Sequence, residues 1–236
     1  MKERFWEIDF LRGLAVLLMI TYHVVFTLNY FGNYTVDGFR LFGFLAAIMF
    51  ILLVGISLSL SYSRAHADFS KYLKRGLKIF SYGLVITAVT FIFLKSGFVV
   101  FGVLHLIGLS IILSYFFFRR RLNILIGIFL IIIGLYIQNV ELDFPYLLWL
   151  GFEPRFYTLD YFPLLPWFGL VLIGIFFGDM LYPNHRRRIN VPEIKFYPIK
   201  LLSLLGRHSL FIYFMHLPII ITLLYVFGFI GFPSVF

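Results

Sequence analysis

The sequence predicts an all-α, polytopic integral membrane protein, a helical bundle of about seven transmembrane helices. Hydrophobic residues make up 61% of its 236 residues and charged residues only 13%, against about 25% in soluble domains. The apolar residues form long runs of about 20, the length that crosses a bilayer as a helix. This composition excludes a soluble enzyme, a disordered chain and a collagen-like fibre. The absence of cysteine excludes thiol catalysis, disulfides and cysteine-based metal sites.

Seven apolar segments meet the length rule, and each is predicted to form one spanning helix. They cover residues 10–31, 41–62, 76–95, 100–118, 122–138, 164–182 and 209–232. The first is too long for the apolar region of a signal peptide and contains Arg12, so we predict a retained anchor. Between the last two segments, Pro198 to Gly206 is predicted to be a short surface helix. We take residues 1–236 as a single domain.

The distribution of basic residues predicts the orientation of the bundle. With the N-terminus in the cytoplasm, all 20 Lys and Arg except Arg40, Lys95 and Arg155 fall on the inner side. This rule also accounts for the net charge of +9 without a nucleic-acid partner. We expect a multi-pass protein of the cell (plasma) membrane, in contact with membrane lipids, with a homodimer left open.

Three polar residues of the first segment, Asp9, Arg12 and His23, are predicted to share one helical face. The eleven residues from Arg12 to His23 make about three turns and about 16 Å of rise. Asp9 falls within about 40° of the same line. One interpretation is a pocket entered from the inside, with His23 at its deep end. The other is an Asp9–Arg12 pair that fixes topology and a histidine that hydrogen-bonds between helices.

Two further groups lie toward the predicted outer side. His105, early in the fourth segment, is either catalytic or a helix-packing residue beside Gly102 and Gly108. Asp160 opens the sixth segment, where an acid favours the positive end of the helix dipole or acts near the pocket. Tyr161 and Trp167 fit the interfacial aromatic belt or contact a substrate.

The start of the last segment predicts an anion site. Arg207 and His208 precede Ser209, a predicted N-cap, and cations at a helix N-terminus can hold a phosphate. The alternative for Arg207 is a positive-inside topology signal. Tyr213 and His216 follow within the helix, and His216 is placed to face the same cavity.

With these residues, the chain resembles the catalytic domain of the heparan-alpha-glucosaminide N-acetyltransferase family, in a short prokaryotic form. The matching pieces follow one another along the chain: Arg4 to Asp9, Leu11 to Ala15, Met19 and His23, Leu53 to Ser57, Phe101 to Gly108, Asp160 to Trp167, and Leu205 to Leu210 with Tyr213 and His216. The wider superfamily includes membrane O-acetyltransferases of bacterial polysaccharides.

The resemblance implies transfer of an acetyl group from cytosolic acetyl-CoA to a sugar hydroxyl or amine, without a metal. His23 is then a general base or a transient acyl carrier. Asp160 and His105 are weaker candidates for orienting the acceptor, and Tyr161 and Trp167 for binding it. The acetyl-CoA site is expected at the remaining polar residues: Asp9, Arg12, Arg207, His208, Tyr213 and His216.

One departure from the family pattern leaves the acceptor open. The lysosomal enzyme has a functional histidine in an outer loop after its first helix, where this chain has Gly32, Asn33, Tyr34 and Thr35. His23 instead matches the in-helix histidine of the O-acetylating relatives.

Two non-enzymatic alternatives remain at this stage. One is a transporter or a lipid- or small-molecule-binding membrane protein, although the paired broken helices of a transporter are not visible in the sequence. The other is a scaffold subunit whose polar residues only hold helices together.

Overall fold

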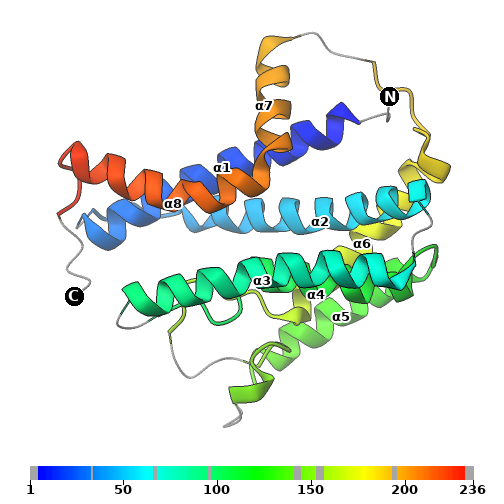
Figure 1. Ribbon diagram of the computed structural model, residues 1–236, viewed down its shortest axis with the longest axis horizontal. Helices are drawn as coiled ribbons and strands as arrows, with labels where there is room; N and C mark the ends of the chain where they lie inside the picture. Colours follow the sequence, from blue (N-terminus) through cyan, green and yellow to red (C-terminus); the bar gives the residue numbers. More distant parts are fainter. Residues whose placement is uncertain are drawn as a thin grey trace. The chain divides into compact units, whose positions relative to one another are not determined.

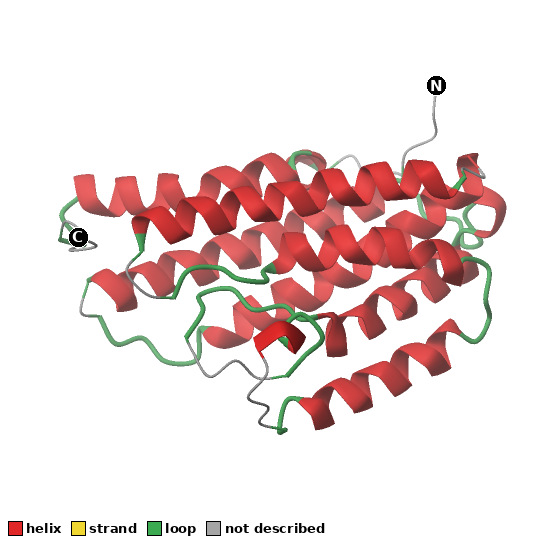
Figure 2. Ribbon diagram, turned by 60° about the horizontal axis from the view of Figure 1, so that its bottom comes forward, coloured by secondary structure: helices red, strands yellow, loops and turns green. Residues whose placement is uncertain are grey.

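The computed structural model describes residues 5–32, 34–65, 68–94, 97–140, 145–152, 157–192 and 196–231. In these ranges the chain is helical with connecting loops, which confirms the all-α class (Figure 2). The helices are α1 (Trp6–Phe31), α2 (Arg40–Ala65), α3 (Phe69–Phe93), α4 (Val103–Ser114), α5 (Asn123–Ile137), α6 (Leu164–Leu181), α7 (Tyr197–Arg207) and α8 (Ser209–Val226) (Figure 1). Short 3₁₀ turns cover Tyr115–Phe117, Pro145–Leu147 and Pro183–His185.

Within the part of the chain just given, five helices are long and apolar enough to cross a membrane: α1, α2, α3, α6 and α8. The chain is therefore a multi-pass membrane protein. The predicted fourth and fifth spans coincide with the shorter apolar helices α4 and α5. At 15 residues, α5 extends about 22 Å, less than a hydrocarbon core of about 30 Å. The count of seven spans and the cytoplasmic N-terminus stay predictions.

Several predicted helix boundaries were wrong. The third helix begins at Phe69 rather than at residue 76, because Asp68 caps it by accepting a hydrogen bond from the Lys71 amide. The last helix ends at Val226 rather than at residue 232. The predicted short helix near Pro198 is confirmed as α7. Four residues used in the sequence arguments, Arg4, Asn33, Lys95 and Arg155, lie outside the described residues.

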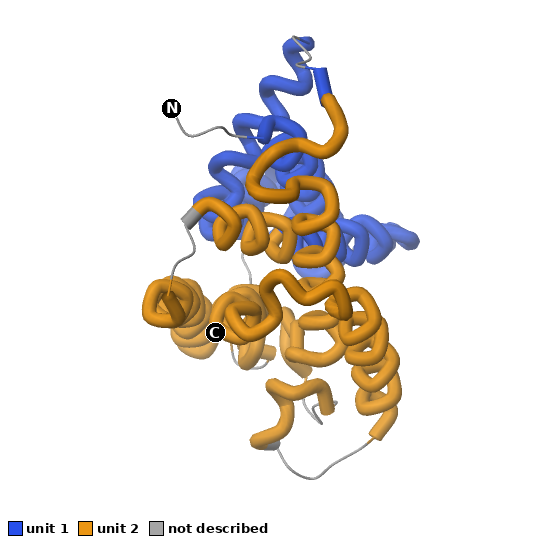
Figure 3. The backbone as a smooth tube through the Cα atoms, turned by 90° about the vertical axis from the view of Figure 1, so that its right-hand side faces the viewer, with its two compact units in different colours: residues 1–53, 191–234 blue, residues 54–190, 235–236 orange. Residues whose placement is uncertain are grey.

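Contacts within the chain divide it into two compact units (Figure 3). The first unit contains residues 1–53 and 191–234, so it joins α1 and the first half of α2 to α7 and α8. In it, α1 packs against both α7 and α8. Tyr22 of α1 lies against Gly43 of α2, where the 2.7 Å approach to an added Cβ leaves no room for a side chain.

The second unit contains residues 54–190 and 235–236. Its helices pack in the pairs α3–α4 and α5–α6, and α4 also contacts α6. Gly76 and Gly108 let the backbones of α3 and α4 meet, since a Cβ on Gly76 would lie 2.6 Å from the Gly108 carbonyl oxygen. Gly127 and Gly169 likewise let the backbones of α5 and α6 meet, since a Cβ on Gly127 would lie 2.7 Å from the Gly169 carbonyl oxygen.

Candidate active site

The polar face predicted for α1 lies on a helix without interruption from Trp6 to Phe31. Its first turns carry Asp9 and Arg12, and its middle carries His23, about 16 Å further along. Asp9 contacts α7 and His23 contacts α8. The shared face predicted from helical periodicity therefore points toward the two C-terminal helices of the first unit.

Asp9 joins two cations from different helices. Its side chain is buried, 2% exposed for the whole residue. One carboxylate oxygen accepts a hydrogen bond from Arg12 Nη1 at 3.0 Å, and the other accepts one from Arg207 Nε at 3.3 Å. Both guanidinium groups are part-exposed, with side-chain exposures of 26% for Arg12 and 45% for Arg207. The three side chains place two fixed positive charges around one buried negative charge.

Backbone contact between α1 and α7 fixes this cluster. A Cβ on Gly13 would overlap the Leu202 carbonyl oxygen, and a Cβ on Gly206 would overlap the Asp9 carbonyl oxygen. Because only glycine permits so close an approach, the two helices cross with their backbones touching. The crossing brings Arg207, at the end of α7, to the first turns of α1.

His23 and His216 face each other from α1 and α8. Their ring centroids are 4.5 Å apart and the rings are inclined at 74°. Nδ1 of His23 lies 2.8 Å from the Met19 carbonyl oxygen, and Nδ1 of His216 lies 2.6 Å from the Tyr213 carbonyl oxygen. A carbonyl oxygen only accepts hydrogen bonds, so each Nδ1 carries a proton and, in the neutral ring, Nε2 holds the lone pair.

Two tyrosines lie close to this pair of rings. Tyr22 meets the His23 ring edge-on at 4.9 Å between centroids, and Tyr213 lies 5.6 Å from the His216 ring. The buried Thr27 hydroxyl donates to the His23 carbonyl oxygen at 2.7 Å. Nε2 of His216 is buried and has no hydrogen-bond partner among the described residues. The arrangement presents a proton-accepting nitrogen inside an apolar helix pair.

The predicted capping arrangement before α8 was wrong. The residue at the N-cap position is His208, and Ser209 is already the first helical residue, without a side-chain cap. Arg207 is the last residue of α7. Because α7 runs to Arg207 and α8 begins at Ser209, His208 alone lies between the two helices and takes the N-cap position. The Arg207 side chain bonds the Asp9 carboxylate. His208 itself is exposed.

In the second unit, His105 and Asp160 come together at the N-terminus of α4. The Gly102 amide donates to His105 Nδ1 at 3.2 Å, and the Val103 amide donates to an Asp160 carboxylate oxygen at 3.1 Å. The Asp160 carboxylate, expected at the dipole of the sixth helix or near the pocket, thus satisfies an amide at the start of α4. In the neutral ring, His105 carries its proton on Nε2, which is buried without a partner in the described ranges.

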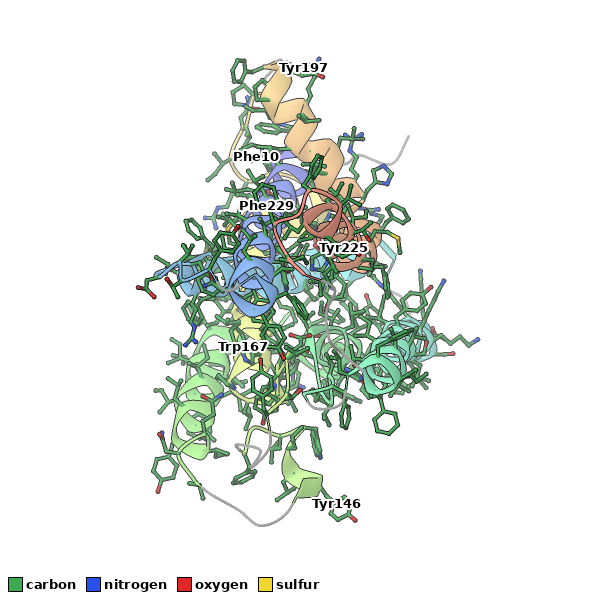
Figure 4. All side chains as sticks on the ribbon, turned by 90° about the vertical axis from the view of Figure 1, so that its left-hand side faces the viewer. Phe10, Tyr146, Trp167, Tyr197, Tyr225 and Phe229 are labelled. Carbon is green, nitrogen blue, oxygen red and sulfur yellow. The ribbon has the colours of Figure 1, made fainter. Side chains whose placement is uncertain are left out.

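The two predicted substrate-binding aromatics make contacts within the second unit. The Tyr161 hydroxyl lies 2.8 Å from the carbonyl oxygens of both Leu148 and Phe152, and its single proton serves one at a time. Trp167 packs against Phe162 with a centroid distance of 4.9 Å. Figure 4 labels Trp167 on α6 and Tyr146 on the short turn before Leu148. These contacts explain the positions of both aromatics structurally, and their substrate role stays a prediction.

One polar pair was missed by the sequence analysis. The buried Ser59 of α2 donates to the Asp179 carboxylate of α6 at 2.5 Å, beside the close approach of Gly178 to Ser59. The signal in the sequence was an acid in the last turn of an otherwise apolar helix. Among the described residues, no group of three or more His, Asp or Glu side chains is placed to hold a metal.

Comparison with known families identifies the family of this chain. The family model of the heparan-alpha-glucosaminide N-acetyltransferase catalytic domain matches residues 4–218. The chain belongs to this family. The matched range runs from before Asp9 to beyond His216 and extends through both compact units. No curated protein and no solved structure matches the chain.

Membership of the heparan-alpha-glucosaminide N-acetyltransferase family, together with the apolar helices, identifies a membrane acetyltransferase. The predicted resemblance is thereby confirmed. Two polar clusters of the first unit, the Asp9–Arg12–Arg207 cluster and the His23–His216 pair, lie within the matched range.

Proposed function

We propose that this protein transfers an acetyl group from cytosolic acetyl-CoA to an amino or hydroxyl group of a glycan. The observation that carries the proposal is the polar face of α1. It brings two arginines to one end of the helix and a pair of imidazoles to its middle, and both groups contact the C-terminal helices. The distance between them, about 16 Å, suits an extended thioester arm with anionic phosphates at its far end.

The CoA phosphates bind at Arg12 and Arg207 in this proposal. A guanidinium fork suits phosphate oxygens, and both side chains are part-exposed while paired with Asp9. Asp9 does not itself contact a phosphate, since like charges repel; it holds the two guanidinium groups in place. His208, exposed between α7 and α8, adds a further donor at the same end.

His23 acts as the base at the acetyl group. Its Nε2 lone pair removes a proton from the acceptor nitrogen or oxygen, which attacks the thioester carbonyl carbon. The carbon–sulfur bond then breaks, and the imidazolium returns the proton to the CoA thiolate. The variant route, in which Nε2 first carries the acetyl group, uses the same nitrogen and stays open. His216 orients the His23 ring through their edge-to-face contact.

Turnover by the purified protein in nanodiscs tests the proposal. Acetyl-CoA is offered with amino sugars, polysaccharides and lipid-linked sugars, and both CoA release and acetylated product are measured. His23→Asn keeps a donor for the Met19 carbonyl but lacks a base, so turnover should fall by about 10²–10⁴-fold. Equal turnover by His23→Asn and the parent protein would remove His23 from the mechanism.

Thermal unfolding with CoA separates this enzyme from a carrier or scaffold. A ligand present at about 100 times its Kd should add about 2.7 kcal/mol to the free energy of unfolding. Stabilisation lost in Arg12→Gln and Arg207→Gln would place the ligand at these side chains. No stabilisation by CoA or acetyl-CoA in the parent protein would favour a non-enzymatic membrane protein.

A further inference from the structure

The short helix α7 exposes an apolar stripe that the proposed reaction does not use. Tyr197, Leu201 and Leu204 are 74%, 47% and 49% exposed. Their spacing of four and three residues puts them on one side of the helix. Ser203 and Gly206 are buried instead, at the contact with α1. The helix is thus attached by a small-residue face and leaves its larger apolar side chains uncovered.

The direction of α7 sets where this stripe lies in a membrane protein. In the first unit α1 and α8 pack together, and Figure 1 shows α7 rising steeply away from both. Figure 4 places Tyr197 at the far end of α7. With 11 residues α7 extends about 16 Å, too short to cross a bilayer. Because α1 and α8 have the length and hydropathy of spanning helices, a helix set across them lies along the membrane surface.

Basic side chains flank the stripe. Lys200 is exposed beside Leu201, and Arg207 ends the helix with its side chain 45% exposed. An apolar stripe beside basic residues is the pattern of helices that lie in the headgroup region of anionic membranes. Arg207 belongs to the Asp9 cluster at the start of α1, and Lys200 is the other basic residue of α7.

We propose that α7 is an interfacial helix that inserts Tyr197, Leu201 and Leu204 at the boundary of headgroups and acyl chains, and that binds anionic phospholipid headgroups through Lys200. This inference holds whether or not the protein transfers acetyl groups. It gives α7 a second role, because the helix that contacts lipid also carries Arg207 to the Asp9 carboxylate.

Depth measurements test the position of the helix. The chain has no cysteine, so a single cysteine at Tyr197, Leu201 or Leu204 can carry a nitroxide without background labelling. In phosphatidylcholine–phosphatidylglycerol nanodiscs, accessibility to oxygen and to a nickel chelate reports depth. Labels at Asn190→Cys, exposed in a loop, and Val85→Cys, 55% exposed on the candidate span α3, provide the aqueous and lipid references.

Similar, intermediate depths at the three stripe positions are expected. A Tyr197 label as accessible to the nickel chelate as the Asn190 label would overturn the proposal, because α7 would then project into water. All labelled variants must elute as a single species before measurement, and the three positions are read independently of enzyme activity.

The lipid preference is tested with a fluorophore on Leu204→Cys. Quenching by acyl-chain nitroxide phosphatidylglycerol should exceed quenching by the matching phosphatidylcholine at equal mole fraction. Lys200→Gln should lower this preference by up to about fivefold, the weight of one basic residue near an anionic surface. Lys78→Gln, the same charge change at an exposed site on α3, should leave it unchanged. Equal quenching by the two lipids, or equal effects of the two substitutions, would overturn headgroup binding by Lys200.

Discussion

The imidazole ring of His23 meets that of His216 edge to face, 4.5 Å between centroids, although 193 residues of sequence separate them. Each ring is held by its own helix, through Nδ1 to a backbone carbonyl oxygen of the preceding turn. Neither Nε2 nitrogen takes part in these two bonds. Two side chains fixed in this way should act as one unit.

A double-mutant cycle measures this coupling. His23→Asn and His216→Asn both keep a donor for the backbone carbonyl and remove Nε2. We expect the first to lower kcat by about 10²–10⁴-fold and the second by about tenfold. Because the rings touch, the double variant should be no slower than His23→Asn alone. Losses that multiply in the double variant, measured as acetyl-CoA turnover, would contradict a shared role.

Helical periodicity was enough to predict half of this site. The positions of Asp9, Arg12 and His23 on one face of α1 follow from residue spacing, and the long apolar run fixed the helix that carries them. The family resemblance grouped Arg207 and His216 at one site with these residues, but periodicity could not predict which of them touch, because it contains no information on which distant helix packs against α1. The glycines that permit the α1–α7 crossing, Gly13 and Gly206, were visible only as small residues.

In the second unit too, the sequence did not show which distant segments are in contact. His105 and Asp160 were judged separately, one as a residue of the fourth segment and the other as the start of the sixth. Both satisfy amides at the first turn of α4, and Asp160 reaches it across 57 residues of sequence from Val103. A local cap such as Asp68 can be predicted from neighbouring residues, whereas a cap supplied by another segment depends on the tertiary fold.

Removal of the Asp9 charge should weaken both the fold and the binding of acetyl-CoA. In Asp9→Asn, two guanidinium groups remain close together without their common carboxylate. Because both arginines are part-exposed, we expect a loss of about 1–3 kcal/mol in the free energy of unfolding. The KM for acetyl-CoA should rise while kcat changes less. Arg207→Lys is the matched control, since it keeps the positive charge but lacks the planar guanidinium group. An unchanged KM for acetyl-CoA in Asp9→Asn would contradict the proposal that Asp9 holds the two guanidinium groups in place.

Two substitutions of Asp160 distinguish its role as a cap of α4 from a role in acetyl transfer. Asp160→Ala removes the acceptor of the Val103 amide and should cost about 0.5–2 kcal/mol of stability, whereas Asp160→Asn keeps an oxygen acceptor and should cost less. Thermal unfolding of the two variants checks the order. If Asp160→Asn unfolds like the parent protein but turns over acetyl-CoA at least about 100 times more slowly, the carboxylate acts on the acceptor as well.

A single methyl group added at the α1–α7 crossing tests whether backbone contact between these helices holds Arg207 beside Asp9. In Gly206→Ala the new Cβ would overlap the Asp9 carbonyl oxygen and lie 2.8 Å from the Gly13 amide nitrogen, so the helices must separate. Overpacking of this kind costs about 1–3 kcal/mol, and here it also draws Arg207 away from Asp9. Thermal unfolding and the KM for acetyl-CoA should therefore change together. Gly231→Ala adds the same methyl group where no atom lies within 4 Å, and it should change neither. A Gly206→Ala protein that unfolds and binds like the Gly231→Ala control would show that backbone contact at this crossing does not hold the arginine in place.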